Sequence, residues 1–174
     1  MIDLETLATT PDAVVLTCGG VKFDPWSGAE PDRPFYLRLN VDEQTNIGRR
    51  TADASLEWWN TQPEGVREEA LSDGNRVTLD EFQKQLNRYL VGADYLWAQG
   101  PLFDYAILEN LYTQLEQPFP WQFWQIRDSR TLFSLVPNAT KKIKSTDMHN
   151  ALADCYFQAK TVQYCYRELK VPKQ

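Results

Sequence analysis

The first six residues, MIDLET, place two carboxylates, Asp3 and Glu5, two positions apart in a segment with the character of a first strand. Side chains at positions i and i+2 of a strand point to the same face of its sheet. Two acids on one face repel each other and lose water, which is costly unless a divalent cation neutralises them. The pair therefore predicts a metal site, with a solvated surface pair as the alternative.

The length and composition of the chain are those of one globular domain. Its 174 residues, 43% hydrophobic and 13% aromatic, are enough for a single core, so we expect one domain over residues 1–174. No apolar run is long enough to cross a bilayer, and Asp3 and Glu5 interrupt the place of a secretory leader. We expect a cytoplasmic protein without a membrane partner, and its three cysteines to be mostly buried, reduced thiols.

The formal net charge of −6 bears on possible partners. It argues against a protein that holds nucleic acid on a broad basic surface. It does not exclude a nuclease, because four carboxylates gathered at a metal site would account for most of the excess, and bound cations would offset them.

Strand patterns dominate the start of the chain, and helices alternate with strands after it. Residues 13–23 and 35–40 predict a second and a third strand, which form a meander with the first. Thr51, Thr78 and Asp128 are the expected helix caps. The expected helices cover 51–62, 63–72, 78–91, 102–115, the residues after Asp128 and 150–169, and further strands cover 94–99 and 121–126. This order predicts an α/β fold with a mixed sheet flanked by helices.

Two adjacent tryptophans, Trp58 and Trp59, lie in the expected helix at 51–62. Neighbouring residues on a helix point about 100° apart. We therefore expect one ring to pack into the core and the other to meet a loop, a partner or a substrate base. The chain has six tryptophans in all, an aromatic excess that is compatible with a homodimer without requiring one.

Asp3, Glu5, Asp104, His149 and Asp154 form one candidate set. The four acids come from a strand and from two expected helix starts, an arrangement that can build an oxygen cage for hard cations. His149, the sole histidine, stands five residues before Asp154, which would place the two side chains about 140° apart on one helix. Both can serve one site if His149 lies in the loop ahead of the helix and Asp154 in its opening turns. A histidine that merely caps the helix is the alternative.

Three segments of this chain, MIDLET, LFDYAIL and HNALAD, resemble the three ordered motifs of the DnaQ-like exonucleases of the DEDDh type. The similarity is greatest to the small 3′-to-5′ exonucleases of phage and bacterial origin. Those enzymes also carry a tryptophan pair after the third strand and a segment like RDSRT, here residues 127–131. The resemblance extends from residue 1 to about residue 167.

The resemblance implies a ribonuclease H-like fold with a mixed five-stranded sheet and two Mg²⁺ or Mn²⁺ ions. It implies that Asp3, Glu5, Asp104 and Asp154 are metal ligands and that His149 is the general base. The expected activity is the release of nucleoside 5′-monophosphates from a free 3′ end of DNA or RNA, with single strands favoured. A nuclease-like module that binds nucleic acid or protein without catalysis is the alternative, and it would be expected to have lost one of the ligands.

Several further residues are candidate substrate contacts. They are Thr6, Leu7, Phe103, Trp59 and Lys144. Lys144 lies near Lys141 and Lys142, and these lysines either contact phosphates of the incoming strand or form a solvated basic loop. Arg127 and Arg130 receive no role from the sequence.

Overall fold

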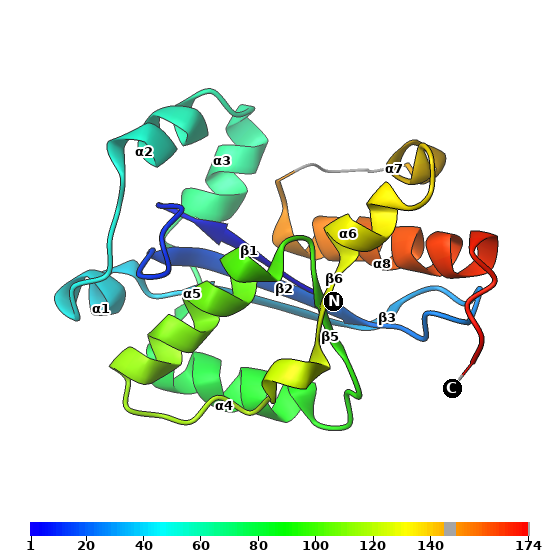
Figure 1. Cartoon of the computed structure of the whole chain (residues 1–174). Coiled ribbons are helices and arrows are strands. Elements are labelled where there is room, and N and C mark those ends of the chain that lie inside the picture. Colours follow the sequence, from blue (N-terminus) through cyan, green and yellow to red (C-terminus); the bar gives the residue numbers. More distant parts are fainter. Residues whose placement is uncertain (145–148, 174) are drawn as a thin grey trace.

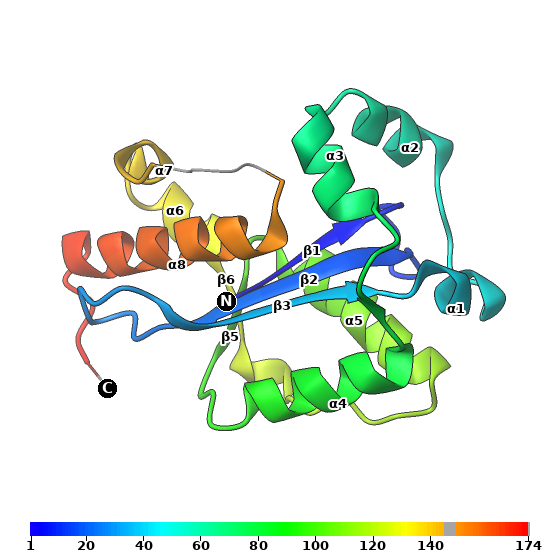
Figure 2. The same cartoon turned by 180° about the vertical axis from the view of Figure 1, so that it is seen from behind.

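In the computed structural model, which describes residues 1–144 and 149–173, the chain forms a sheet between two helical layers (Figure 1). Helix α8 (Ala151–Glu168) covers one face of the sheet, whereas α4 (Leu79–Leu90) and α5 (Pro101–Gln114) cover the other. The view from behind shows the same layers (Figure 2). The central strands therefore have two covered faces, which can bury different kinds of side chain.

The first three strands form the predicted meander. Strands β1 (Ile2–Thr6), β2 (Val15–Lys22) and β3 (Asp32–Leu39) pair antiparallel in chain order, and β4 (Arg76–Val77) joins β3 in parallel. Asp3 pairs with Gly19, and Glu5 pairs with Thr17. The mixed α/β architecture expected from the sequence, with its initial meander, is confirmed and agrees with a ribonuclease H-like fold.

Two short strands lie beyond β1. Strands β5 (Leu96–Ala98) and β6 (Ile126–Asp128) form a parallel ladder, and β5 runs in contact with β1. Among the described residues the hydrogen-bonded strands form a four-stranded and a two-stranded sheet rather than one sheet of five. The count differs because β4 extends the meander, while β1 and β5 are not joined by a ladder of backbone hydrogen bonds.

Polar side chains and backbone contacts set where the helices begin. Thr78 accepts a hydrogen bond from the Glu81 backbone at 3.2 Å, and Asp128 accepts one from Arg130 at 3.0 Å, as predicted for helix caps. The expected cap at Thr51 is wrong. The backbone of Ala52 donates to the Leu7 carbonyl at 2.8 Å, and this residue, without a capping side chain, precedes α2.

The remaining helices complete the layers. They are α1 (Val41–Asn46), α2 (Asp53–Asn60), α3 (Glu64–Leu71), α6 (Ser129–Ser134), α7 (Ala139–Lys142) and the 3₁₀ helix Phe123–Gln125. The strand expected over 121–126 is a 3₁₀ turn for much of its length, because Gln122 and Gln125 cap the turn reciprocally and β6 starts only at Ile126. Within residues 1–144 and 149–173, no helix has the length and apolar character needed to cross a membrane.

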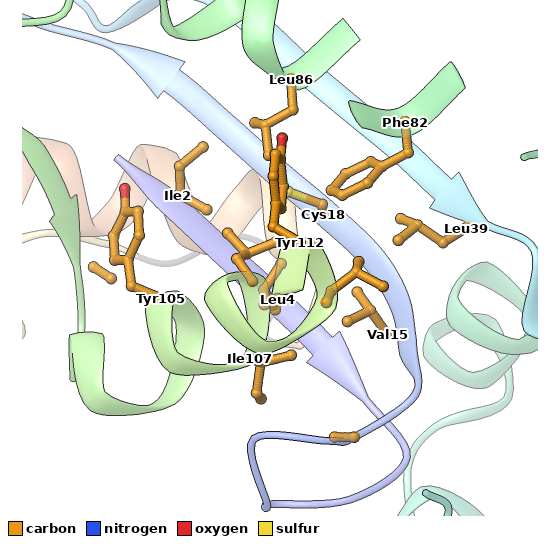
Figure 3. Close-up of a cluster of buried hydrophobic side chains, with 14 of the residues drawn as sticks. Ile2, Leu4, Val15, Cys18, Leu39, Phe82, Leu86, Tyr105, Ile107 and Tyr112 are labelled. Atoms are coloured by element: carbon orange, nitrogen blue, oxygen red, sulfur yellow. The ribbon is translucent and has the colours of Figure 1, made fainter. Parts of the chain in front are cut away.

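The apolar core lies between the sheet and the layer of α4 and α5. Figure 3 shows Ile2 and Leu4 of β1 packed in this cluster with Phe82 and Leu86 of α4. All four side chains are at most 5% exposed. Burial of a side chain of this size contributes roughly 1.5–3 kcal/mol, so the inward face of β1 is a major source of stability.

Helix α8 approaches the opposite face of the sheet at a glycine. A Cβ atom on Gly19 would lie 2.3 Å from the carbonyl carbon of Ala151, the first residue of α8. Only glycine leaves room for backbone at this distance. Because Gly19 pairs with Asp3, the close approach brings the start of α8 beside the acidic face of β1. The three free cysteines, Cys18, Cys155 and Cys165, are buried, as expected.

Candidate active site

Three carboxylates from two elements converge at the start of α8. Asp3 and Glu5 project from one face of β1, and Asp154 lies in the first turn of α8. Each offers an oxygen atom within 4.8 Å of the oxygens offered by the other two. Carboxylate oxygens this close are the ligands that hard divalent cations prefer.

The fourth predicted acid, Asp104, enters the same site from α5. It is 3% exposed, and its Oδ1 accepts a hydrogen bond from the Leu4 backbone at 3.1 Å, between the two acids of β1. Asp104 lies outside the tight three-residue group, but all four acids and His149 line one cavity of about 540 Å³. The structure therefore brings the five predicted residues together.

His149 lies just ahead of α8, as the spacing to Asp154 required. Its backbone has a left-handed φ of 64°, and its N–H donates to Asp154 Oδ2 at 3.0 Å. Asn150 then caps the helix by accepting hydrogen bonds from Leu152 and Ala153. The side chain that caps α8 is therefore that of Asn150 and not that of His149. His149 instead lines the cavity.

Burial and mutual repulsion raise the pKa of the acids. The pKa of Glu5 is raised to about 8 by burial and by the charges of Asp154 and Asp104. Burial raises the pKa of Asp104 to about 7, and it raises that of Asp3 well above its ordinary value, helped by the charges of the neighbouring acids. The pKa of Asp154 is also raised by burial. A site with these properties holds protons when no cation is bound, and cations can replace those protons.

Gln158 supports Asp3 from α8, one turn after Asp154. Its Nε2 donates to Asp3 Oδ1 at 2.8 Å, which fixes the carboxylate and offsets a small part of the rise in its pKa. Its carbonyl oxygen is buried and accepts no hydrogen bond within the described part of the chain. Sequence reasoning missed Gln158, although its position four residues after Asp154 on a helix places both side chains on one face.

Of the predicted substrate contacts, one lines the cavity and two are buried in the core. Phe103 is half-buried and lines the cavity, whereas Leu7 is 6% exposed and packs in a core cluster. Trp59 is 1% exposed and donates from its indole nitrogen to the Thr6 carbonyl at 2.9 Å. Trp59 therefore cannot stack on a substrate base, and that expectation is corrected. The exposed ring of the pair is Trp58, at 40%.

The basic side chain at the cavity is an arginine and not one of the predicted lysines. Lys141 and Lys142 end α7, and both they and Lys144 are exposed away from the cavity lining. Arg130, to which the sequence assigned no role, does line the cavity. Among the described residues it is the one lysine or arginine that does so. Its Nη2 donates to the Gln99 carbonyl at 3.0 Å, and a Cβ on Gly100 would lie 3.5 Å from that same nitrogen. That distance is an ordinary van der Waals contact, so glycine is favoured at this position by its left-handed φ of 106° and not by lack of space.

The fold and the site together define the class. A mixed sheet that opens with an antiparallel meander, and acids that meet from its first strand and from two helix starts, are the features of a DEDD-type exonuclease with a ribonuclease H-like fold. The family model described as the 3′-5′ exoribonuclease Rv2179c-like domain matches residues 1–166, and the chain belongs to this family of phosphodiester hydrolases. A comparison with curated proteins gives no match.

Proposed function

We propose that this protein is a metal-dependent 3′-to-5′ exoribonuclease that releases nucleoside 5′-monophosphates from single-stranded RNA. The observation that carries the proposal is the convergence of Asp3, Glu5, Asp104 and Asp154 with His149 at one cavity. The description of the family favours RNA over DNA as the substrate. No ligand of the expected set is replaced, so a module without catalytic activity has no support from the residues present.

The four acids fit a pair of Mg²⁺ or Mn²⁺ ions. Three of them bring oxygens within 4.8 Å of one another, and burial together with the charges of Asp154 and Asp104 raises the pKa of Glu5 to about 8. Asp3, Glu5, Asp104 and Asp154 would hold the ions. When bound, two such ions lower the pKa of water and stabilise the oxygen that leaves the scissile phosphate.

His149 would serve as the general base. Its backbone N–H is bonded to Asp154, so the residue is tied to the acidic cluster through its main chain while the ring remains at the cavity. Imidazole accepts protons near neutral pH, and a positioned base contributes typically about 10² to 10⁴ in rate. In this role the imidazole takes the proton of the attacking water as the phosphodiester bond breaks.

Two further residues would place the end of the RNA strand. Arg130, in α6, lines the same cavity as Asp154, and its charge suits a phosphate oxygen. Phe103 presents a half-buried aromatic ring on which the terminal base could stack. An Arg130→Gln variant is expected to raise KM about tenfold, whereas Arg88→Gln on the exposed surface of α4 is expected to leave KM unchanged.

The proposal is tested by digestion of matched RNA and DNA oligonucleotides labelled at the 5′ end. With Mg²⁺, the RNA should shorten in steps of one nucleotide, and a phosphate or other block at the 3′ end should stop the reaction. EDTA and Glu5→Gln should each abolish the ladder. Full activity of Glu5→Gln, or internal cleavage of the blocked RNA, would contradict the proposal, and faster digestion of DNA would overturn the choice of RNA.

A further inference from the structure

Trp58 contacts the ring of His149 although the two residues lie far apart in the sequence. The ring centroids are 4.8 Å apart and the ring planes meet at 88°, an edge-to-face arrangement. Aromatic rings prefer this geometry because the positive edge of one meets the negative face of the other. Trp58 is 40% exposed overall, so this contact is not a consequence of burial in the core.

The imidazole of His149 has few other restraints. The hydrogen bond to Asp154 Oδ2 is made by the His149 backbone, so it fixes the main chain without fixing rotation of the ring. Within residues 1–144 and 149–173, no side-chain hydrogen bond orients the ring nitrogens of His149. The indole of Trp58 is thus the aromatic group that limits the orientation of the ring.

Trp58 is in turn fixed to the strand that carries two of the acids. Its ring meets Trp59 edge to face at 5.0 Å and 77°. The indole nitrogen of Trp59 donates to the carbonyl of Thr6 at 2.9 Å, at the end of β1. A continuous set of contacts therefore runs from β1 through the tryptophan pair to His149, and it sets the imidazole relative to Asp3 and Glu5.

We propose that Trp58 is a positioning residue for His149, and that the tryptophan pair holds the imidazole in the orientation in which it faces the attacking water. This inference rests on the proposed function, since it assumes that His149 is the general base. Trp58 acts through His149 and not on the reacting atoms. Its loss should therefore lower kcat and leave KM and metal binding nearly unchanged.

A double-mutant cycle on RNA digestion tests this directly. The variants are Trp58→Ala, His149→Ala and the double variant, with kcat and KM measured for each on one RNA oligonucleotide. Trp58→Ala should lower kcat about tenfold, close to the upper value of an edge-to-face pair. In the His149→Ala background the same change should have no further effect on kcat, because the interaction it removes is already gone.

Two conservative variants separate positioning from folding. Trp58→Phe keeps an aromatic ring and should recover most of kcat, whereas Trp58→Leu keeps an apolar side chain without a ring and should resemble Trp58→Ala. The matched control is Trp124→Ala, since Trp124 is 59% exposed and lies outside the cavity lining. It should not change kcat. Calorimetry with Mn²⁺ should show equal binding in all single variants.

The possible outcomes distinguish the inference from the function on which it rests. If His149→Ala keeps full activity, the role of His149 as base fails. A second outcome is that His149→Ala is impaired and Trp58→Ala lowers kcat tenfold again in that background. The role of His149 as base is then supported, and the positioning role of Trp58 is overturned. A rise in KM alone for Trp58→Ala would also overturn it, because that result assigns Trp58 to direct contact with a substrate base.

Discussion

The two faces of β1 hold side chains of opposite character within five residues. Ile2 and Leu4 are at most 5% exposed and pack against α4 in the apolar core (Figure 3). Asp3 and Glu5 point to the other face, where α8 begins and where Asp154 joins them. A period of two along the strand thus separates a stabilising face from a chemically active one.

The two faces contribute to the free energy of unfolding in opposite directions. The apolar face gains stability from burial, whereas the acidic face keeps like charges close together in a poorly solvated cavity, and this raises their pKa values. Changes on the first face should therefore affect folding, and changes on the second should affect activity. The four predictions that follow test this separation.

The largest effect is expected for Asp3→Asn. This change removes a charged ligand, so several kcal/mol of metal-dependent stabilisation of the transition state is lost and kcat/KM falls by at least about 10³-fold. The metal-free variant should be as stable as the parent or more stable at pH 8, because repulsion among the acids is relieved. Stopped-time RNA digestion and urea unfolding measure the two quantities. The control Asp42→Asn, on the exposed first turn of α1, should change neither.

Leu4→Ala should show the reverse pattern. It removes a 5% exposed side chain from the core, and such changes typically cost about 2–5 kcal/mol in the free energy of unfolding. The fraction that remains folded should keep kcat within a few-fold, provided that the assay is made well below the unfolding transition. Urea unfolding with activity measured on the same sample checks both points. A stable but inactive Leu4→Ala protein would show that the two faces are not separable.

Gly19→Ala tests the link between the faces. Its new Cβ would lie 2.3 Å from the backbone of Ala151, so α8 must move away and carry Asp154 with it. We expect a loss of about 1–3 kcal/mol in stability and weaker Mn²⁺ binding by calorimetry. The matched control is Gly20→Ala, whose Cβ faces side-chain atoms of Ile2 and Tyr89 at 3.0 Å on the other face of the sheet. That variant should keep its affinity for Mn²⁺ even if it loses stability.

The smallest effect is the pH dependence of stability. The pKa values of about 8 for Glu5 and about 7 for Asp104 lie above those of carboxyls in an unfolded chain, about 4. The folded protein then binds more protons at these two groups than the unfolded one, so their contribution to stability is fully present below pH of about 4 and is lost as the pH rises through about 8. In EDTA the free energy of unfolding should therefore decrease steadily from pH 5 to pH 8.

Added Mn²⁺ should reverse this dependence, because cations bind the deprotonated carboxylates of the folded state. Urea unfolding across the pH series, with EDTA or with Mn²⁺, makes the comparison. Glu5→Gln serves as the control, since it removes a titrating group and should flatten the slope in EDTA. An equal slope in Glu5→Gln would assign the pH dependence to other residues.

Local sequence signals predicted the parts of the fold and site that local chemistry determines. Asp3 and Glu5 share a face because of the strand period, and Thr78 caps α4 because its side chain reaches the Glu81 backbone. His149 and Asp154 serve one cavity because the helix begins between them, at Asn150. Each of these depends on residues at most five positions apart in the chain.

Contacts between distant segments could not be predicted in this way. Arg130 reaches the cavity only because β6 pairs with β5, and Trp58 meets His149 only because α2 and the start of α8 lie on the same side of β1. Trp58 and Trp59 were expected to differ in burial, but which of them faces the core depends on where α2 docks. The start of β6 differs from the prediction for a local reason instead, since the reciprocal cap of Gln122 and Gln125 overrides an apolar pattern typical of a strand.

The most direct test of the account is the position of Mn²⁺ in a crystal of this protein, located by its anomalous scattering. We predict an anomalous peak in contact with the carboxylates of Asp3, Glu5 and Asp154, and its loss in crystals of Asp3→Asn grown under the same conditions. Wild-type crystals that bind Mn²⁺ only elsewhere, or show no peak at these carboxylates at millimolar Mn²⁺, would contradict the assignment of the acidic face of β1 as the metal site.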